Sequence, residues 1–146
     1  MIYYPVFLNL AGKRVLVAGA GPVALRKVRG LIEAGALVTV VAPEALGEFG
    51  ALPVRLLRRR FRASDVRAAA LVFAATNDRR VNRRVAEAAR RYGIPVNVAD
   101  SAAECGFIVP ARIHRGEVQI AVSTGGRSPR LAAALRRKIE SALAEP

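Results

Sequence analysis

The chain has 146 residues, which is enough for one domain with a real hydrophobic core, or for one domain and a small appendage. Hydrophobic residues make up 53% of it, a share that argues against disorder. No apolar run approaches the length of a membrane span, so we expect no membrane partner. The formal net charge of +13 attracts phosphates, polycarboxylates or nucleic acid, but the arginines are scattered and aromatics are sparse, so we expect no nucleic-acid partner.

The first predicted elements are a strand, a turn, a helix and a second strand. Short apolar runs at residues 15–18 and 37–41 have the length and composition of buried strands. Between them, residues 19–24 read Gly-Ala-Gly-Pro-Val-Ala, and a helix-like segment follows. This order and spacing are typical of a dinucleotide-binding βαβ unit; a purely structural glycine turn is the alternative.

Each residue type in this turn suits the binding of a pyrophosphate. Gly19 permits a tight turn, Gly21 lets a phosphate approach the backbone, and Ala24 allows the helix to pack close to the strand. The first helical turn, which contains Pro22 and Val23, offers free N–H groups and the positive end of the helix dipole. We therefore predict that these five residues bind the cofactor.

The acidic residue that usually follows the second strand of an NAD-binding unit is missing. Ala42 and Pro43 stand at this position, and Glu44 lies two residues beyond the strand end. No arginine adjoins the strand end to favour the 2′-phosphate of NADP. We therefore predict NAD as the cofactor, with Ala42 and Pro43 close to it.

Strands and helices continue to alternate through residue 98. The predicted elements are a strand at 53–57, a helical turn at 64–69 capped by Ser64, a strand at 71–75, a helix at 79–92 and a strand at 95–98. We expect Asp78 to cap the long helix and Gly93 to end it. This rhythm predicts an α/β fold with a Rossmann-like, doubly wound parallel sheet over residues 1–108.

The rhythm changes in residues 109–146, which we predict to be a dimerisation region. Apolar runs at 107–113 and 118–122, joined by a turn at 114–117, predict a β-hairpin. Ser128 and Pro129 suit the start of a final helix over 131–143. Both elements have apolar faces that little else in so short a chain can cover, so we expect a homodimer.

The carboxyl ends of the strands are the expected place for a ligand. Thr76 and Asn77 follow one strand and are predicted to bind the cofactor. Asp100 follows the next strand, where it could act as a general base or cap a turn. Thr124 and its neighbouring glycines could form an anion-binding nest or a flexible turn.

The other reactive side chains indicate no further catalytic or metal site. His114 falls in the predicted hairpin turn, where we expect it to be exposed to solvent. Cys105 is the single cysteine, which fits a reducing cytosol, and no cluster of cysteine and histidine could bind a metal. The N-terminus has no basic segment ahead of an apolar stretch, so we expect no signal peptide and a cytoplasmic protein.

Taken together, seven segments resemble the precorrin-2 dehydrogenase family, which forms the N-terminal part of siroheme synthases. The resemblance covers nearly the whole chain in order, and its last two segments are the most specific. These segments are residues 4–10, 17–27, 40–43, 74–78 with Asn82, 95–100, 105–111 (Cys-Gly-Phe-Ile-Val-Pro-Ala) and 123–132 (Ser-Thr-Gly-Gly-Arg-Ser-Pro-Arg-Leu-Ala).

The resemblance implies NAD-dependent oxidation of precorrin-2 to sirohydrochlorin, with Asp100 as the catalytic residue. It also implies a homodimer, and a substrate whose eight carboxylates give the arginines a use. We expect the substrate to be bound by Asn97, Ser123, Thr124, Gly125, Gly126 and Ser128, the last five lying near the nucleotide site of the other subunit.

Three features depart from the family pattern. Gly106 replaces a common polar residue and Ala102 a frequent proline. The sequence also ends at Pro146, so we expect the family's C-terminal helical module to be absent. Three alternatives stay open: an enzyme that also or mainly inserts Fe²⁺ into sirohydrochlorin, a non-catalytic nucleotide- or tetrapyrrole-binding protein, and a basic nucleic-acid binder.

Overall fold

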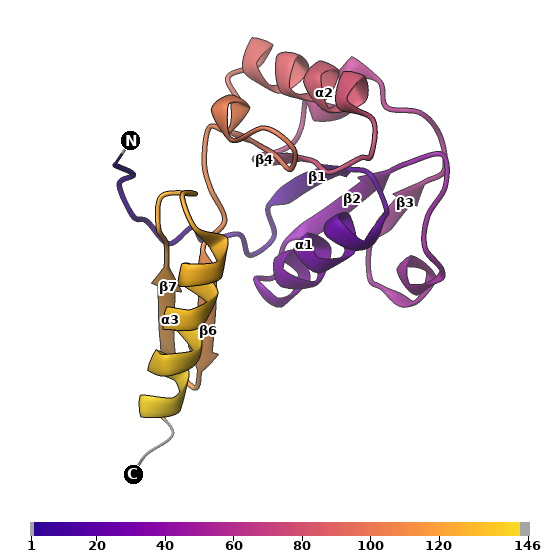
Figure 1. The fold of residues 1–146 in the computed structure, drawn as a ribbon. Helices are drawn as coiled ribbons and strands as arrows, with labels where there is room; N and C mark the ends of the chain where they lie inside the picture. Colours follow the sequence, from indigo (N-terminus) through magenta and orange to yellow (C-terminus); the bar gives the residue numbers. More distant parts are fainter. Residues whose placement is uncertain (1, 144–146) are drawn as a thin grey trace. The chain divides into compact units, whose positions relative to one another are not determined.

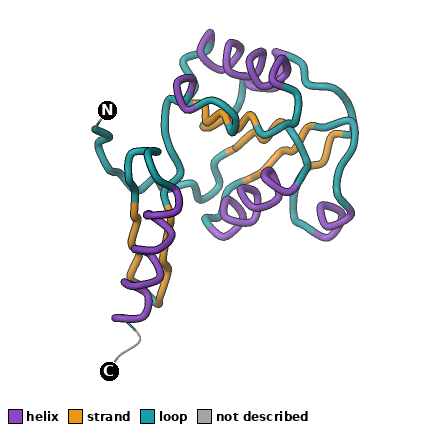
Figure 2. The backbone as a smooth tube through the Cα atoms, in the orientation of Figure 1, coloured by secondary structure: helices purple, strands orange, loops and turns teal. Residues whose placement is uncertain are grey.

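The computed structural model describes residues 2–143, which divide into two compact units (Figures 1 and 2). The larger unit spans residues 7–107. The smaller unit combines residues 108–143 with residues 2–6. Within the described residues, every helix is too short or too polar to span a bilayer.

A parallel five-stranded sheet forms the centre of the larger unit, with strand order β3-β2-β1-β4-β5. Ala18 at the end of β1 pairs with Val41 of β2 and Ala74 of β4, so three strands end at the same level. This topology confirms the predicted Rossmann-like fold. The strands are β1 (Arg14–Ala18), β2 (Leu37–Val41), β3 (Arg55–Leu57), β4 (Leu71–Ala74) and β5 (Val96–Val98).

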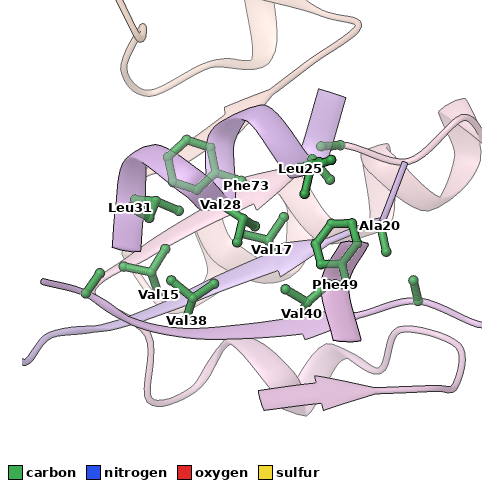
Figure 3. Close-up of a cluster of buried hydrophobic side chains, with 14 of the residues drawn as sticks. Val15, Val17, Ala20, Leu25, Val28, Leu31, Val38, Val40, Phe49 and Phe73 are labelled. Carbon is green, nitrogen blue, oxygen red and sulfur yellow. The ribbon is translucent and has the colours of Figure 1, made fainter. Parts of the chain in front are cut away.

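Helices cover both faces of this sheet, because side chains along each strand point alternately to either face. Figure 1 shows α1 (Pro22–Glu33) on one face and α2 (Arg79–Arg91) on the other. Val28 and Leu31 of α1 pack with alternate strand residues, as Figure 3 shows. The other strand residues pack with α2. Each face therefore has its own apolar core.

The ends of the helices follow from local sequence. Asp78 caps α2 by accepting a hydrogen bond from the backbone N–H of Arg80 at 2.8 Å, as predicted. Gly93, with φ of +65°, follows the end of α2, also as predicted. The prediction of Ser64 as an N-cap is wrong, because the short 3₁₀ helix η2 (Ala63–Val66) begins after Arg62. The 3₁₀ helices η1 (Gly47–Ala51) and η3 (Ala102–Glu104) were not predicted.

The smaller unit is a hairpin packed against one helix. Strands β6 (Ala111–Arg115) and β7 (Val118–Val122) are antiparallel, and Ile113 is buried. Helix α3 (Pro129–Ala142) begins at the predicted Ser128 cap, whose Oγ accepts a hydrogen bond from the N–H of Leu131 at 3.1 Å.

The predicted start and turn of the hairpin are wrong. Phe107 packs edge-on against Phe73 in the larger unit, and Pro110 has no N–H to donate, so β6 begins only at Ala111. The turn contains two residues, Gly116 and Glu117, rather than four. His114 therefore lies in β6, where it is exposed and pairs with Gln119.

Candidate cofactor and active site

An open cleft of about 1240 Å³ lies at the carboxyl ends of the parallel strands. It is built from the glycine turn, the segment after β2, the loop after β4 and the residues after β5. Most of the predicted site residues of the larger unit line it. They are Gly19, Gly21, Pro22, Val23, Ala42, Pro43, Thr76, Asn77 and Asp100.

Glycine is found at the two positions of the turn for different structural reasons. Gly19 has φ of +110°, and a Cβ there would lie 2.3 Å from the carbonyl oxygen of Ala75. Only glycine permits this close approach of two backbones. A Cβ at Gly21 would meet nothing within 4 Å. Gly21 therefore leaves open space at the start of α1, where a ligand can approach the backbone.

The start of α1 suits an anion. Its cap, Gly21, has no side chain, and the first turn carries no acidic residue to neutralise the positive end of the helix. The N–H of Leu25 donates to the carbonyl of Gly21 at 2.9 Å, whereas those of Val23 and Ala24 precede the first helical bonds. Arg26 also lines the cleft. These groups fit a pyrophosphate.

The loop after β4 lies next to the glycine turn. Thr76 and Asn77 line the cleft together with Asp78. Hydrogen bonds from the side chain and the backbone of Arg80 hold the pKa of Asp78 below its usual value. Asp78 therefore stays ionised as the cap of α2, and Asn77 is the exposed residue of the loop.

Asp100 follows β5 and is about one-third exposed in the cleft. Its Oδ1 lies 3.6 Å from Nη1 of Arg79, the first residue of α2. Nη2 of Arg79 lies 2.7 Å from Oε2 of Glu104, and this hydrogen bond raises the pKa of Arg79. A permanent positive charge therefore stands beside the Asp100 carboxylate.

Two predicted site residues do not line the cleft. Ala24 is fully buried between α1 and the sheet. Asn97 is buried on the α1 face, where its Oδ1 accepts a hydrogen bond from Nζ of Lys27 at 2.9 Å. Its Nδ2 donates to the carbonyl of Phe107 at 3.1 Å. Burial, and then the neighbouring charge of Arg26, lower the pKa of Lys27.

The remaining predicted residues lie in the smaller unit, in the turn before α3. Ser123 Oγ accepts a hydrogen bond from the N–H of Gly125 at 3.0 Å. Thr124 Oγ1 accepts one from the N–H of Ser128 at 3.0 Å, and Gly125 and Gly126 have positive φ. The turn is thus internally braced. The proposed contact of these residues with substrate stays a prediction.

Sequence reasoning did not single out the cations of the cleft. Arg26, Arg60, Arg80 and Arg84 all line it, and they come from three separate parts of the chain. Arg26 and Arg84 could have been found from their positions in the early turns of the two helices that follow strand ends. Among residues 2–143, histidine, cysteine and carboxylate side chains form no group of three suited to a metal.

Two family models and a solved structure match this chain. Residues 6–111 match a family described as putative NAD(P)-binding, and residues 115–142 match the sirohaem biosynthesis protein central family. The solved structure of SirC, precorrin-2 dehydrogenase, is similar with a TM-score of 0.81 and 33% identity. That similarity covers 95% of this chain and 70% of SirC.

The chain belongs to the precorrin-2 dehydrogenase and siroheme synthase family. It is 50% identical over 145 residues to a siroheme synthase of Thioalkalivibrio sulfidiphilus and 48% identical over 147 residues to one of Methylococcus capsulatus. These matches include 97% and 98% of this chain. The chain spans only 30% and 31% of the length of these two relatives. Membership of this family supports NAD as the cofactor.

Proposed function

We propose that this chain catalyses the NAD-dependent oxidation of precorrin-2 to sirohydrochlorin. One observation carries the proposal: the uncapped start of α1 at Gly21 and the carboxylate of Asp100 line the same cleft. The first suits the pyrophosphate of a dinucleotide, and the second suits the removal of a proton from substrate. The family relatives that include SirC, precorrin-2 dehydrogenase, support this substrate.

The cofactor would be held by the residues around the glycine turn. The N–H group of Val23 would bind the pyrophosphate at the open start of α1, and Arg26 would add charge from the same end of the helix. Thr76 and Asn77 would contact the adenosine half. When bound, NAD⁺ supplies an acceptor for a hydride from the substrate.

Asp100 would accept the proton that the substrate loses. Its carboxylate is partly exposed to the cleft, so a substrate can reach it. The guanidinium of Arg79 lies 3.6 Å from Oδ1 and gives this carboxylate a cationic neighbour. Arg79, held in turn by Glu104, would also keep the carboxylate in one orientation.

The arginines of the cleft would bind the carboxylates of the substrate. Arg60 and Arg84 line the cleft, whereas Arg80 is already engaged by Asp78 at 3.4 Å. Arginine forms paired, charge-assisted hydrogen bonds with carboxylates, so these side chains suit a polycarboxylate.

We further propose a cytoplasmic homodimer held by residues 109–146, of which the structure describes 109–143. Val118, Leu131 and Leu135 are 50%, 51% and 39% exposed in the smaller unit. Exposed apolar side chains on a hairpin and its helix suit burial against a two-fold-related copy. In that dimer, residues 123–128 would approach the nucleotide site of the other subunit.

The direct test mixes the purified chain with precorrin-2 and NAD⁺ and follows the absorption spectrum of sirohydrochlorin together with NADH. We expect both products to appear in equal amounts. A parallel reaction with Fe²⁺ measures siroheme formation. NAD⁺ binding without any oxidation of precorrin-2 would contradict the proposal and favour a non-catalytic binding protein.

A further inference from the structure

Asn82 in α2 is the most completely buried polar side chain of the described chain, with no exposed surface. The other buried residues of the helix, Val85, Ala86, Ala88 and Ala89, are apolar. A buried amide is tolerated only when its donors and acceptors are paired. The partners of Asn82 therefore indicate why an apolar residue does not fill this position.

Within residues 2–143, the hydrogen bonds of this side chain all go to one residue, Thr76. Asn82 Oδ1 accepts hydrogen bonds from the Thr76 N–H at 3.0 Å and from its hydroxyl at 2.7 Å. Asn82 Nδ2 donates to the Thr76 carbonyl at 3.1 Å. The amide thus holds both backbone groups and the side chain of Thr76, and these bonds fix which way the amide points.

Thr76 in turn shapes the loop that lines the cleft. Its hydroxyl accepts a hydrogen bond from the N–H of Asp78 at 3.2 Å and lies 3.0 Å from the Asp78 carbonyl. Asp78 is fixed separately as the cap of α2. With both neighbours held, Asn77 is presented on a loop with little freedom.

The same residue also adjoins the glycine turn. A Cβ on Gly19 would lie 2.9 Å from the backbone nitrogen of Thr76. Asn82 therefore holds Thr76 where the glycine turn and the loop after β4 meet. Loops braced in this way need less ordering when a ligand binds.

We infer that Asn82 is a positioning residue for the cofactor, holding residues 76–78 in the conformation that binds the adenosine half of NAD⁺. This inference rests on the proposed cofactor site. Asn82 itself lies beneath the loop and does not line the cleft.

The test compares Asn82→Leu with Val85→Ala. Leucine fills a similar volume but makes no hydrogen bond to Thr76. Val85 is equally buried, one helical turn away, and packs in the apolar core of α2, so its truncation lowers stability without touching the loop. We expect Asn82→Leu to weaken NAD⁺ binding about 10-fold or more by calorimetry, and Val85→Ala to leave it within twofold.

A second measurement needs no nucleotide. Hydrogen exchange of the Thr76 amide should be protected in the parent chain and in Val85→Ala, and accelerated in Asn82→Leu. Asn82→Asp gives a further variant should leucine prevent folding. Its protonated carboxyl has the donor and the acceptor of the amide, so NAD⁺ affinity should recover as the pH falls.

The outcomes separate this inference from the proposed function. A parent chain that binds no NAD⁺ would overturn both. Binding of NAD⁺ within twofold of the parent by Asn82→Leu, or equal losses in Asn82→Leu and Val85→Ala, would overturn the inference alone. Faster hydrogen exchange of the Thr76 amide together with weaker NAD⁺ binding in Asn82→Leu would support the inference.

Discussion

Gly19 and Ala75 bring the ends of β1 and β4 so close together that a Cβ on Gly19 would lie 2.3 Å from the Ala75 carbonyl oxygen. The positive φ of Gly19 adds a second reason for glycine. We predict that Gly19→Ala destabilises the fold by about 3 kcal/mol or more, because it combines overpacking with backbone strain. Chemical denaturation measures this loss.

Gly21 provides the opposite case. Its backbone is extended and a Cβ would meet nothing within 4 Å, so Gly21→Val should fold and lose about 1 kcal/mol or less, as a poorer helix cap. The added side chain would occupy the approach to the N–H groups of α1 and abolish NAD⁺ binding. Unchanged NAD⁺ affinity in calorimetry would make the glycine turn purely structural.

A substitution of Asp100 should affect the oxidation step and leave cofactor binding unchanged. We predict that Asp100→Ala keeps NAD⁺ affinity near normal and lowers the rate of precorrin-2 oxidation about 10²-fold or more, the usual effect of losing a positioned acid–base group. Single-turnover kinetics at saturating NAD⁺ measure the rate. Oxidation within a few-fold of the parent rate would leave Asp100 only as the ion-pair partner of Arg79.

The sheet and the glycine turn could be predicted because their signals are local. Strand periodicity and cap residues depend on neighbours in the chain, so Ser128 and Asp78 were found as helix caps. The start of β6 was missed, since Phe107 packs against Phe73, far away in sequence. Apolar runs do not reveal which unit a residue joins.

The candidate site shows the same limit. Gly21, Thr76 and Asp100 could be placed at strand ends by counting along the chain, and they line one cleft. The bonds of Asn82 to Thr76, and the pairing of Arg79 with Asp100, depend on how α2 lies against two loops. Such tertiary contacts leave no spacing pattern in a single sequence.

Arg84 and Arg83 form a matched pair for testing substrate recognition. Arg84 lines the cleft, whereas Arg83 is outside its lining and pairs with Glu87 at 3.1 Å. We predict that Arg84→Ala raises KM for precorrin-2 about 10-fold, since a charge-assisted hydrogen bond is worth roughly 1.5–3 kcal/mol. Arg83→Ala should leave KM within twofold. If both variants raised KM equally in steady-state assays, the cause would be the loss of surface charge in general and not of a contact in the cleft.

Asp65 gives the fold a defined pH dependence. Hydrogen bonds from Arg59, at 2.7 and 2.9 Å, and from the N–H of Arg62 outweigh burial and hold its pKa below the usual value. Because the folded pKa is lower than the unfolded one, this stabilisation is present above about pH 4 and is lost as the pH falls through the folded pKa. Asp65→Asn should lower Tm by a few degrees at pH 7 and converge with the parent at acid pH. A constant difference in Tm across pH would contradict this.

The smaller unit carries the predicted homodimer interface. Leu131 and Leu135 are exposed on α3, one turn apart, while Ala132 of the same helix is buried against the hairpin. We predict that the chain is a homodimer at micromolar concentration and that Leu131→Glu with Leu135→Glu dissociates it, because charges would have to be buried in the interface. Light scattering measures the mass, and Arg137→Glu, an exposed change of charge on the same helix, is the control.

If residues 123–128 complete the site of the other subunit, the double variant should lose precorrin-2 oxidation together with the dimer while NAD⁺ still binds. A parent chain that is monomeric and fully active would overturn this arrangement.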